Sequence, residues 1–326
     1  MPKLLTLNNG MKMPQVGLGC WKIPNDICAD QVYEAIKAGY RLFDGATDYA
    51  NEVEVGKGLK RAMDDGIVKR QDLFVVSKLW NNFHHPDHVK LNLKRNLKDL
   101  GLDYLDLYYI HFPIAFKFVP MEERYPPQMY TGKADEAKGI LTEENVPLLD
   151  TYRALEECQR EGLIKSIGIS NFNGGLVADI LRGCSIKPVA LQIEHHPYLT
   201  QEKLLEYCKI HDVQVVGYSS FGPQSFADCG MDLAKNTPPL FDHPVIKKIA
   251  EKHNVSTAEV LLRWATQRGV AIIPKSSHKK RLLSNLNIDD NVTLTEEDLK
   301  SISGLNQNLR FNDPWDWNNS KFPIFH

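Results

Sequence analysis

The sequence has no excess of charge of either sign. It contains 39 basic and 41 acidic residues among 326, which gives a formal net charge of -2. A protein that binds nucleic acid or an anionic membrane through surface charge needs a basic face. We therefore expect neither nucleic acid nor a membrane among its partners.

Long hydrophobic runs and closely spaced cysteines are also missing. No stretch approaches the roughly 18 apolar residues that a membrane helix needs, and the segment that opens Met1-Pro2-Lys3-Leu4-Leu5 has no apolar region long enough for a signal peptide. The 6 cysteines are spread widely, without C-x-x-C spacing. We therefore expect free thiols, no metal site and a cytoplasmic location.

The glycine motif of a Rossmann dinucleotide-binding fold is incomplete. Gly17-Leu18-Gly19 and Gly56-Lys57-Gly58 each lack the third glycine of that motif. These segments therefore give only weak support to an open, doubly wound sheet, which is the structural alternative to a closed barrel.

What the sequence does contain is a series of short apolar runs, most of them separated by a segment of helix length. The eight runs are Val16–Gly19, Arg41–Asp44, Leu73–Leu79, Leu105–His111, Lys165–Ser170, Pro188–Glu194, Val213–Ser219 and Val270–Pro274. Continuous apolarity is typical of parallel strands buried on both faces. Eight βα units favour a closed (β/α)8 TIM barrel, and because such barrels often exceed the usual domain size we expect one domain over residues 1–326.

Local signals add detail to this barrel. Pro86–Leu100 has apolar residues on one helical face and is followed by Gly101, a typical C-terminal cap. Ser256-Thr257-Ala258-Glu259 is a capping box at a helix start. Asn8-Asn9-Gly10 predicts a tight β-hairpin turn, and we expect this N-terminal hairpin to plug the bottom of the barrel.

Two stretches interrupt the repeat. Residues 112–146 form a long, proline-rich connection after the fourth strand, and such loops are uncommon unless they are functional. The C-terminal tail, residues 305–326, carries five aromatic residues, whereas a disordered tail is poor in them. We expect this tail to pack over the barrel mouth.

Polar residues stand at or just beyond the ends of the predicted strands, where a barrel carries its active site. They are Asp44, Lys78, His111, Asn171, Gln192, Tyr218 and Lys275. Any one of them could simply cap a strand or face solvent. Seven together predict a polar mouth that is capable of acid-base chemistry.

Tyr49 follows the second of these strands and is the candidate proton donor. A phenol titrates at about 10, so it holds its proton at neutral pH. We expect the ammonium of Lys78 to lower that pKa, Asp44 to hold Lys78 charged, and His111 to orient a substrate carbonyl. Such a set could protonate an oxyanion as a hydride arrives, although Tyr49 alone could be an ordinary loop residue.

The sequence resembles the aldo-keto reductases, and within them the fungal xylose reductases. The family resemblance runs from about Leu4 to the C-terminus and rests on three motifs, Gly39–Ala46 with Asn51-Glu52, Leu100–Leu107 with His111 and Pro113, and Ile273–Ser276. The subgroup resemblance rests on the loops His111–Pro120 and Arg310–Trp317.

This resemblance implies a role for each candidate residue. Tyr49 would be the general acid, completed by Asp44, Lys78 and His111. The cofactor would be held by Ser170, Asn171, Gln192, Tyr218, Ser219, Ser220, Phe221, Gly222, Asp228, Lys275, Ser276, Ser277 and Arg281. Within that set Tyr218 would stack on the nicotinamide, and residues 219–228 would fold over the pyrophosphate. The substrate would be lined by Trp21, Asp48, His111, Phe112 and Asn312.

The resemblance also implies NADPH as the preferred cofactor, with NADH possible. Ser277 stands where the family usually has asparagine, which shortens the reach toward the ribose. Its neighbours His278, Lys279 and Lys280 favour a 2′-phosphate, whereas Asp228 would suit the free hydroxyl of NADH. A homodimer is implied by the resemblance alone.

The expected activity is the reduction of open-chain aldoses, with D-xylose converted to xylitol. A general aldehyde reductase of the same family is an alternative. A cofactor-binding regulatory subunit is another, which the complete set of four catalytic residues disfavours. Glu194-His195-His196 at a strand end suggests a metal-dependent hydrolase, but no matching ligand cluster accompanies it.

Overall fold

Parallel strands form the centre of the protein. The computed structural model describes residues 3–127 and 129–326, and within them eight strands follow one another around a single sheet in sequence order. They are Leu18–Gly19 (β3), Leu42–Asp44 (β4), Phe74–Leu79 (β5), Leu107–Ile110 (β6), Ile167–Ser170 (β7), Ala190–Glu194 (β8), Gln214–Tyr218 (β9) and Ala271–Ile272 (β10). Each predicted apolar run contains one of these strands, and the predicted (β/α)8 barrel is confirmed.

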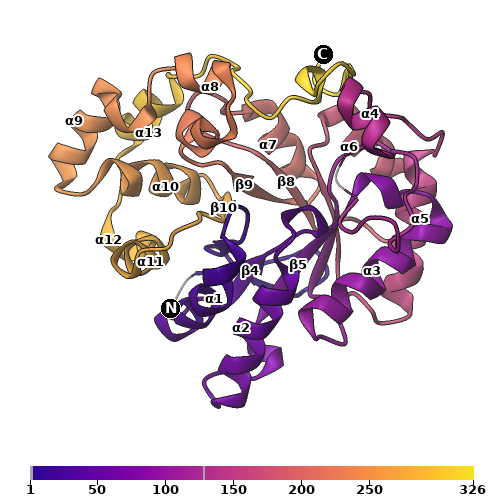
Figure 1. Ribbon diagram of the computed structural model, residues 1–326. Helices are drawn as coiled ribbons and strands as arrows, with labels where there is room; N and C mark the ends of the chain where they lie inside the picture. The colour runs from indigo at the N-terminus through magenta and orange to yellow at the C-terminus, as the bar shows by residue number, and fades with distance from the viewer. Residues whose placement is uncertain (1–2, 128) are drawn as a thin grey trace.

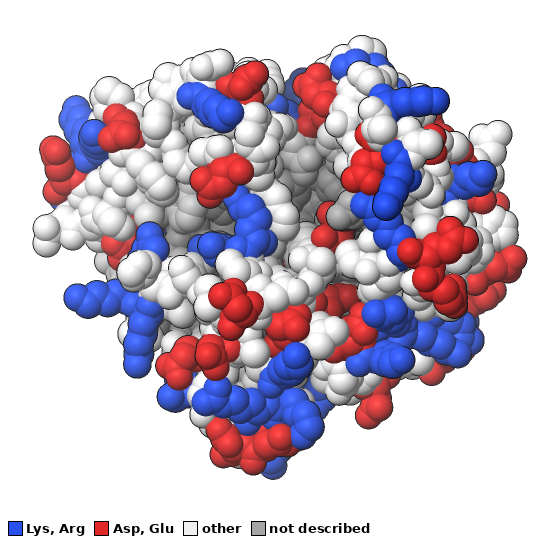
Figure 2. Space-filling view, viewed as in Figure 1, with Lys and Arg blue, Asp and Glu red and all other residues white. Residues whose placement is uncertain are grey.

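Helices lie outside the strands and between them in sequence (Figure 1). They are Asn25–Ala38 (α1), Glu52–Asp64 (α2), Pro86–Leu100 (α3), Lys133–Lys138 (α4), Leu148–Arg160 (α5), Gly174–Gly183 (α6), Glu202–Ile210 (α7), Asp232–Asn236 (α8), Pro244–His253 (α9), Thr257–Gln267 (α10), Lys279–Leu286 (α11), Ile288–Asn291 (α12) and Glu296–Ser303 (α13). In the described part of the protein, none is both long and apolar enough to cross a membrane. Figure 2 shows basic and acidic side chains interspersed over one face.

The predicted helix boundaries at α3 and α10 are confirmed. Gly101 ends α3 in the left-handed conformation, with φ of 66°, where glycine meets no steric penalty. Ser256 accepts a hydrogen bond from the Glu259 amide, and the Glu259 carboxylate accepts one from the Ser256 amide. Local chemistry therefore sets both helix ends.

The first and last strands close the barrel through a short seam. Val16 and Ile272 form a parallel bridge, in which the Gly17 amide donates to the Ile272 carbonyl and the Ile272 amide to the Gln15 carbonyl, both at 2.8 Å. Gly19 lies so close to this last strand that a Cβ there would collide with the Ile273 carbonyl. The glycines at 17 and 19 thus permit close packing rather than a phosphate-binding turn.

Alternate residues of each strand point into the barrel, because side chains alternate between the faces of a strand. Leu42, Val76 and Tyr109 belong to one buried apolar cluster. Two positions further along their strands stand Asp44, Lys78 and His111. The inward-pointing residues of each strand therefore form the apolar interior first and the polar mouth two positions later.

The predicted hairpin forms from Leu4–Thr6 (β1) and Lys12–Pro14 (β2), which pair antiparallel. Leu7 and Met13 from this hairpin are buried in the same apolar cluster as Leu42 and Val76. Met1 and Pro2, at the start of the predicted domain 1–326, lie outside the described residues.

The sequence suggested an irregular connection after β6, but the structure shows that part of this connection is regular. It contains the short helix α4, and Phe116 forms an antiparallel bridge with Glu143. Gln128, within it, lies outside the described residues. The C-terminal tail packs against this connection, since the Asn319 amide donates to the Gly139 carbonyl and Phe116 contacts Phe322. In Figure 1 the yellow tail crosses the upper side from α8 to α4.

Candidate active site

A buried ion pair lies at the centre of the barrel mouth. The Lys78 ammonium donates to Asp44 Oδ1 at 2.6 Å, to the Gly45 carbonyl at 2.8 Å and to the Tyr49 hydroxyl at 3.0 Å. The Lys78 side chain is fully buried and that of Asp44 is 3% exposed. Because the Tyr49 oxygen accepts from Lys78, its own proton is available to another acceptor.

Tyr49 is brought to Lys78 by the turn after β4. Residues Thr47–Tyr49 form a 3-10 turn, and the Thr47 hydroxyl donates to the Lys78 carbonyl at 3.0 Å. Ala50 follows in the left-handed conformation, with φ of 56°, which few non-glycine residues adopt. The loop and the neighbouring strand β5 are therefore tied together at the reactive oxygen.

The expected lowering of the Tyr49 pKa by Lys78 is wrong. Burial raises the pKa of the phenol well above its ordinary value, and the nearby carboxylates of Asp44 and Asp48 add to that effect. The physical reason is that burial removes the water that would stabilise a phenolate, and the charge of Asp44 acts in the same direction. Tyr49 is consequently a protonated phenol at ordinary pH, which suits a proton donor better than a base.

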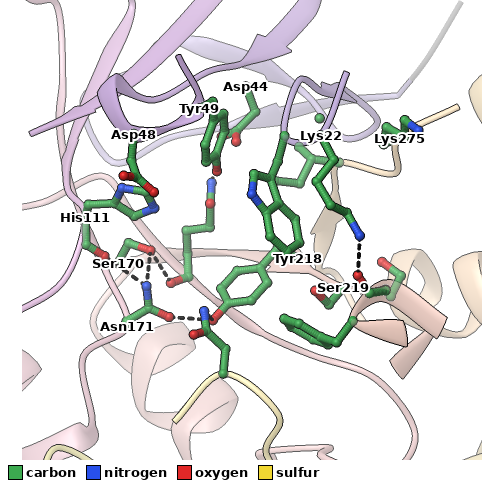
Figure 3. A pocket seen from close by; sticks show the side chains of 18 of the residues that line it. Lys22, Asp44, Asp48, Tyr49, His111, Ser170, Asn171, Tyr218, Ser219 and Lys275 are labelled. Carbon is green, nitrogen blue, oxygen red and sulfur yellow. Dashed lines mark hydrogen bonds between the residues drawn. The ribbon is translucent and has the colours of Figure 1, made fainter. Parts of the chain in front are cut away.

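His111 is held neutral beside this phenol. Burial, with the charge of Lys78, holds the pKa of the imidazole well below its ordinary value. The His111 ring meets the Tyr49 ring edge to face, with centroids 5.9 Å apart. A neutral imidazole can donate a hydrogen bond to a carbonyl without competing as the acid. Figure 3 shows Tyr49 and His111 on the same side of the cavity.

The cavity above these residues has a volume of about 450 Å³. Of the predicted site residues, it is lined by Trp21, Asp44, Asp48, Tyr49, His111, Phe112, Ser170, Asn171, Gln192, Tyr218, Ser219, Ser220, Phe221, Asp228, Lys275 and Asn312. Lys78 lies buried beneath it. The predicted residues Gly222, Ser276, Ser277 and Arg281 are not part of its wall.

Amide and hydroxyl side chains form the wall opposite Tyr49 (Figure 3). Strand register places Ser170 beside Gln192, and Gln192 Nε2 donates to Asp44 Oδ2 at 2.7 Å. The Tyr218 hydroxyl donates to Asn171 Oδ1 at 2.6 Å, and Asn171 Nδ2 donates to the His111 carbonyl at 2.9 Å. These bonds fix the Tyr218 ring against the amide wall.

Aromatic rings form the other side of the cavity. Phe112 packs edge to face against Trp80 and Trp317, with the Trp317 centroid 4.6 Å away. Trp80 and Trp317 also line the cavity. The sequence did not predict either as a site residue, and the only signal for Trp317 was the aromatic content of the tail. Burial raises the pKa of the nearby Asp48 carboxyl to about 6.

A second loop reaches the far end of the cavity. Ser219 adopts the left-handed conformation after β9, with φ of 54°, and opens the segment that ends at Asp228. Lys22, also left-handed, reaches across and donates to the Ser225 carbonyl at 2.7 Å. The sequence had not indicated Lys22, because this contact joins residues about 200 positions apart. Lys275 is exposed nearby, and Arg281 lies on α11 outside the wall.

The Glu194-His195-His196 segment makes contacts that do not suggest a metal centre. Glu194 accepts from His196 and from two backbone amides of the tail, and His195 stacks on Trp264 with ring centroids 4.7 Å apart. Among the residues that the structure describes, no group of three or more potential ligands could hold a metal ion.

Comparisons with known proteins agree on one family. The model of the aldo/keto reductase family matches residues 13–307. The NADPH-dependent aldose reductase of Saccharomyces cerevisiae is 69% identical over the full length of both chains. The NAD(P)H-dependent D-xylose reductase of Kluyveromyces lactis is 66% identical, covering 100% of this chain and 99% of its own. A crystal structure of a Bombyx mori aldo-keto reductase in complex with NADP superposes with a TM-score of 0.84, at 36% identity and 97% coverage of both chains.

Proposed function

The chain belongs to the aldo/keto reductase family, and we propose on this basis that it reduces the open form of D-xylose to xylitol with NADPH or NADH. The observation that carries this proposal is the contact of the Lys78 ammonium with both Asp44 and the Tyr49 hydroxyl beneath a cavity. The full-length similarity to an aldose reductase and a D-xylose reductase supports the substrate class.

The cavity wall fits a nicotinamide dinucleotide. Ser170, Asn171 and Gln192 present hydroxyl and amide groups suited to the carboxamide, and Tyr218 offers a ring held by two hydrogen bonds. Residues 219–228 would cover the pyrophosphate, with Asp228 at the adenosine ribose. The cofactor supplies the hydride.

The protein's own residues supply the proton. Tyr49 donates it to the carbonyl oxygen as that oxygen gains negative charge, since an alkoxide is a stronger base than a phenolate. Lys78 then stabilises the phenolate through the hydrogen bond that it already makes, and Asp44 keeps Lys78 in place. The neutral His111 orients the carbonyl as a hydrogen-bond donor.

The other side of the cavity suits a polyhydroxylated substrate. Asp48 and Asn312 line the wall with groups that bind hydroxyls, whereas Trp21 and Phe112 exclude water from the reacting carbon. A general aldehyde reductase is the second candidate, because the aromatic wall would also accept substrates without hydroxyls.

The test of this function follows NADPH absorbance with D-xylose, with glyceraldehyde and without aldehyde. We expect oxidation with both aldehydes and none without them; no turnover on any aldehyde would refute the proposal. Tyr49→Phe should lower kcat about 10²- to 10⁴-fold, as the loss of a general acid does, and leave NADPH affinity unchanged. Activity that survives this change would refute the role of Tyr49.

NADPH is the cofactor that the basic residues favour. Lys275 lies at the cavity, and Ser276, Ser277 and Arg281 would surround a 2′-phosphate just beyond it. Specificity constants for both cofactors test this preference, and a clear preference for NADH would refute it.

Several further features belong to the same proposal. We infer one domain over 1–326, a hairpin that plugs the barrel, and a tail that covers its mouth. The burial of Leu7 and Met13 with the barrel interior supports the plug, and Trp317 in the cavity wall supports the tail. A cytoplasmic location and a homodimer are part of the proposal as well, and size-exclusion chromatography with light scattering tests the dimer.

A further inference from the structure

Glu194 is a fully buried carboxylate at the end of β8 that the proposed reaction does not use. It continues the row of alternate residues that contains Ala190 and Gln192, and register places it beside Tyr218. Unlike Gln192 and Tyr218, it does not line the cavity. A buried charge is costly unless it is fully hydrogen-bonded, so its partners indicate what it does.

Both oxygens of Glu194 bind the C-terminal tail. Oε1 accepts from the Phe311 amide at 2.9 Å and from His196 Nε2 at 2.8 Å, and Oε2 accepts from the Asn312 amide at 2.8 Å. Burial alone would raise the pKa of Glu194, but these hydrogen bonds and the nearby Arg310 hold it below its ordinary value. The group is therefore an ionised acceptor for two successive amides.

The loop after β8 holds the preceding part of the tail. The Tyr198 carbonyl accepts from the amides of Gln307 and Leu309, at 3.1 and 3.0 Å. Arg310 donates to the Gln201 side chain at 3.2 Å, and Gln201 in turn donates to the Glu194 carbonyl at 2.6 Å. This series of contacts ends at Glu194, which holds the next two amides, the second of them that of Asn312 in the cavity wall.

Asn312 connects this anchor to the cavity. Its backbone is held by Glu194, and its side-chain amide donates to the Tyr218 hydroxyl at 3.1 Å. Tyr218 in turn donates to Asn171 (Figure 3). The position of the Asn312 amide therefore depends on the carboxylate behind it.

We propose that Glu194 is a positioning residue for substrate selection, whose carboxylate fixes the backbone of Asn312 so that the side chain of Asn312 can bind a substrate hydroxyl. This inference rests on the proposed function, because it requires that the substrate be a hydroxylated aldehyde. Glu194 acts through Asn312, and it touches neither the aldehyde nor Tyr49.

Glu194→Gln is the first test, in the full-length protein. The glutamine has nearly the same shape, but its amide group places a donor against one of the two tail amides. Hydrogen bonds to charged groups are among the stronger ones in proteins. We expect kcat/KM for D-xylose to fall about 10- to 100-fold, mostly through KM. Propanal has no hydroxyl that Asn312 could bind, so we expect its kcat/KM to change by less than about 2-fold. The affinity for NADPH should be unchanged.

Glu156→Gln is the matched control. Glu156 is also buried and accepts from two successive amides, those of Ser185 and Ile186, at 2.6 and 2.7 Å. It lies on α5, away from the cavity wall. Both amides bind Oε1 of Glu156, and Oε2 accepts from Arg160 at 3.3 Å. Its replacement therefore neutralises another buried carboxylate that holds backbone amides, and we expect lower stability without a change in the ratio of xylose to propanal activity.

Two further variants keep the test decisive. Asn312→Ala should produce the same loss for D-xylose, and Glu194→Gln added to it should change the ratio no further. If Glu194→Gln does not fold, Glu194→Asp retains the charge but withdraws the carboxylate by one methylene, and we expect it to shift the ratio in the same direction.

The outcomes separate this inference from the proposed function. If the unaltered protein does not reduce D-xylose, the proposed function fails and the inference fails with it. If it reduces D-xylose but Glu194→Gln and Glu194→Asp affect xylose and propanal equally, or match Glu156→Gln, the inference alone is overturned. An additive loss in the double variant with Asn312→Ala would overturn it too.

Discussion

Replacing Asp44 with asparagine should destabilise the barrel as well as stop the reaction. Asp44 and Lys78 form an ion pair at 2.6 Å in which neither side chain is more than 3% exposed. The variant would leave the ammonium buried with neutral acceptors, among them the Gly45 carbonyl and the Tyr49 hydroxyl, and without the carboxylate charge. It would also weaken the acceptor for Gln192.

The expected loss follows from the burial of the pair. Removing one partner of a buried ion pair typically costs about 3–5 kcal/mol, whereas replacing both charges is often nearly neutral. Asp44→Asn should therefore lower the free energy of unfolding by ~3–5 kcal/mol, which corresponds to a fall in Tm of about 4–7 °C for a domain of this size. Asp44→Asn combined with Lys78→Met should recover most of that loss.

Urea unfolding followed by tryptophan fluorescence measures these differences. Asp64→Asn is the control, because Asp64 pairs with Lys60 at the surface, where the side chains are 59% and 71% exposed. Such a pair contributes about 0–1 kcal/mol. If Asp44→Asn costs no more than Asp64→Asn, or if the double variant is less stable than both single variants, the assignment of a buried ion pair is wrong.

Three other predictions concern the substrate, the cofactor and the packing. Burial raises the Asp48 pKa to about 6, so kcat/KM for D-xylose should decline as the pH falls through about 6. In pH profiles, Asp48→Asn should abolish this decline. The same decline at low pH in both proteins would contradict the prediction. Lys275→Met should reduce kcat/KM at least tenfold more for NADPH than for NADH, and equal losses would place the 2′-phosphate elsewhere. Gly58→Ala should cost about 1–3 kcal/mol of stability in urea unfolding, since its Cβ would lie 2.6 Å from the Ala29 carbonyl oxygen. Gly132→Ala, with open space around it, is the control and should change stability far less.

The barrel and the centre of the site could be predicted because they follow from short-range patterns. Asp44, Lys78 and His111 each extend an inward-facing row of a strand, and eight such rows in sequence order specify where they meet. The helix end at Gly101 and the capping box at Ser256 depend only on neighbouring residues. These features required no knowledge of distant contacts.

The parts that could not be predicted depend on contacts between distant segments. Lys22 meets Ser225, and Trp317 meets Phe112, only because the barrel brings loops and tail together. The direction of the Tyr49 pKa shift depends first on how deeply the phenol is buried and then on the nearby carboxylates of Asp44 and Asp48, which the spacing of these residues in the sequence does not reveal. The cofactor-binding roles of the predicted residues stay predictions, and Ser276, Ser277 and Arg281 also lie outside the cavity wall.

The seam between the first and last strands has a consequence for biosynthesis. The backbone bridge between Val16 and Ile272 cannot form until Ile272 has left the ribosome. Most of the protein is therefore synthesised while the sheet is still open. Throughout that period both edges present unpaired backbone groups, which attract other chains. We expect nascent chains released before Ile272 to aggregate or engage chaperones, and a circular permutation that makes the two seam strands consecutive to move the late-closing seam to the strands at the new termini.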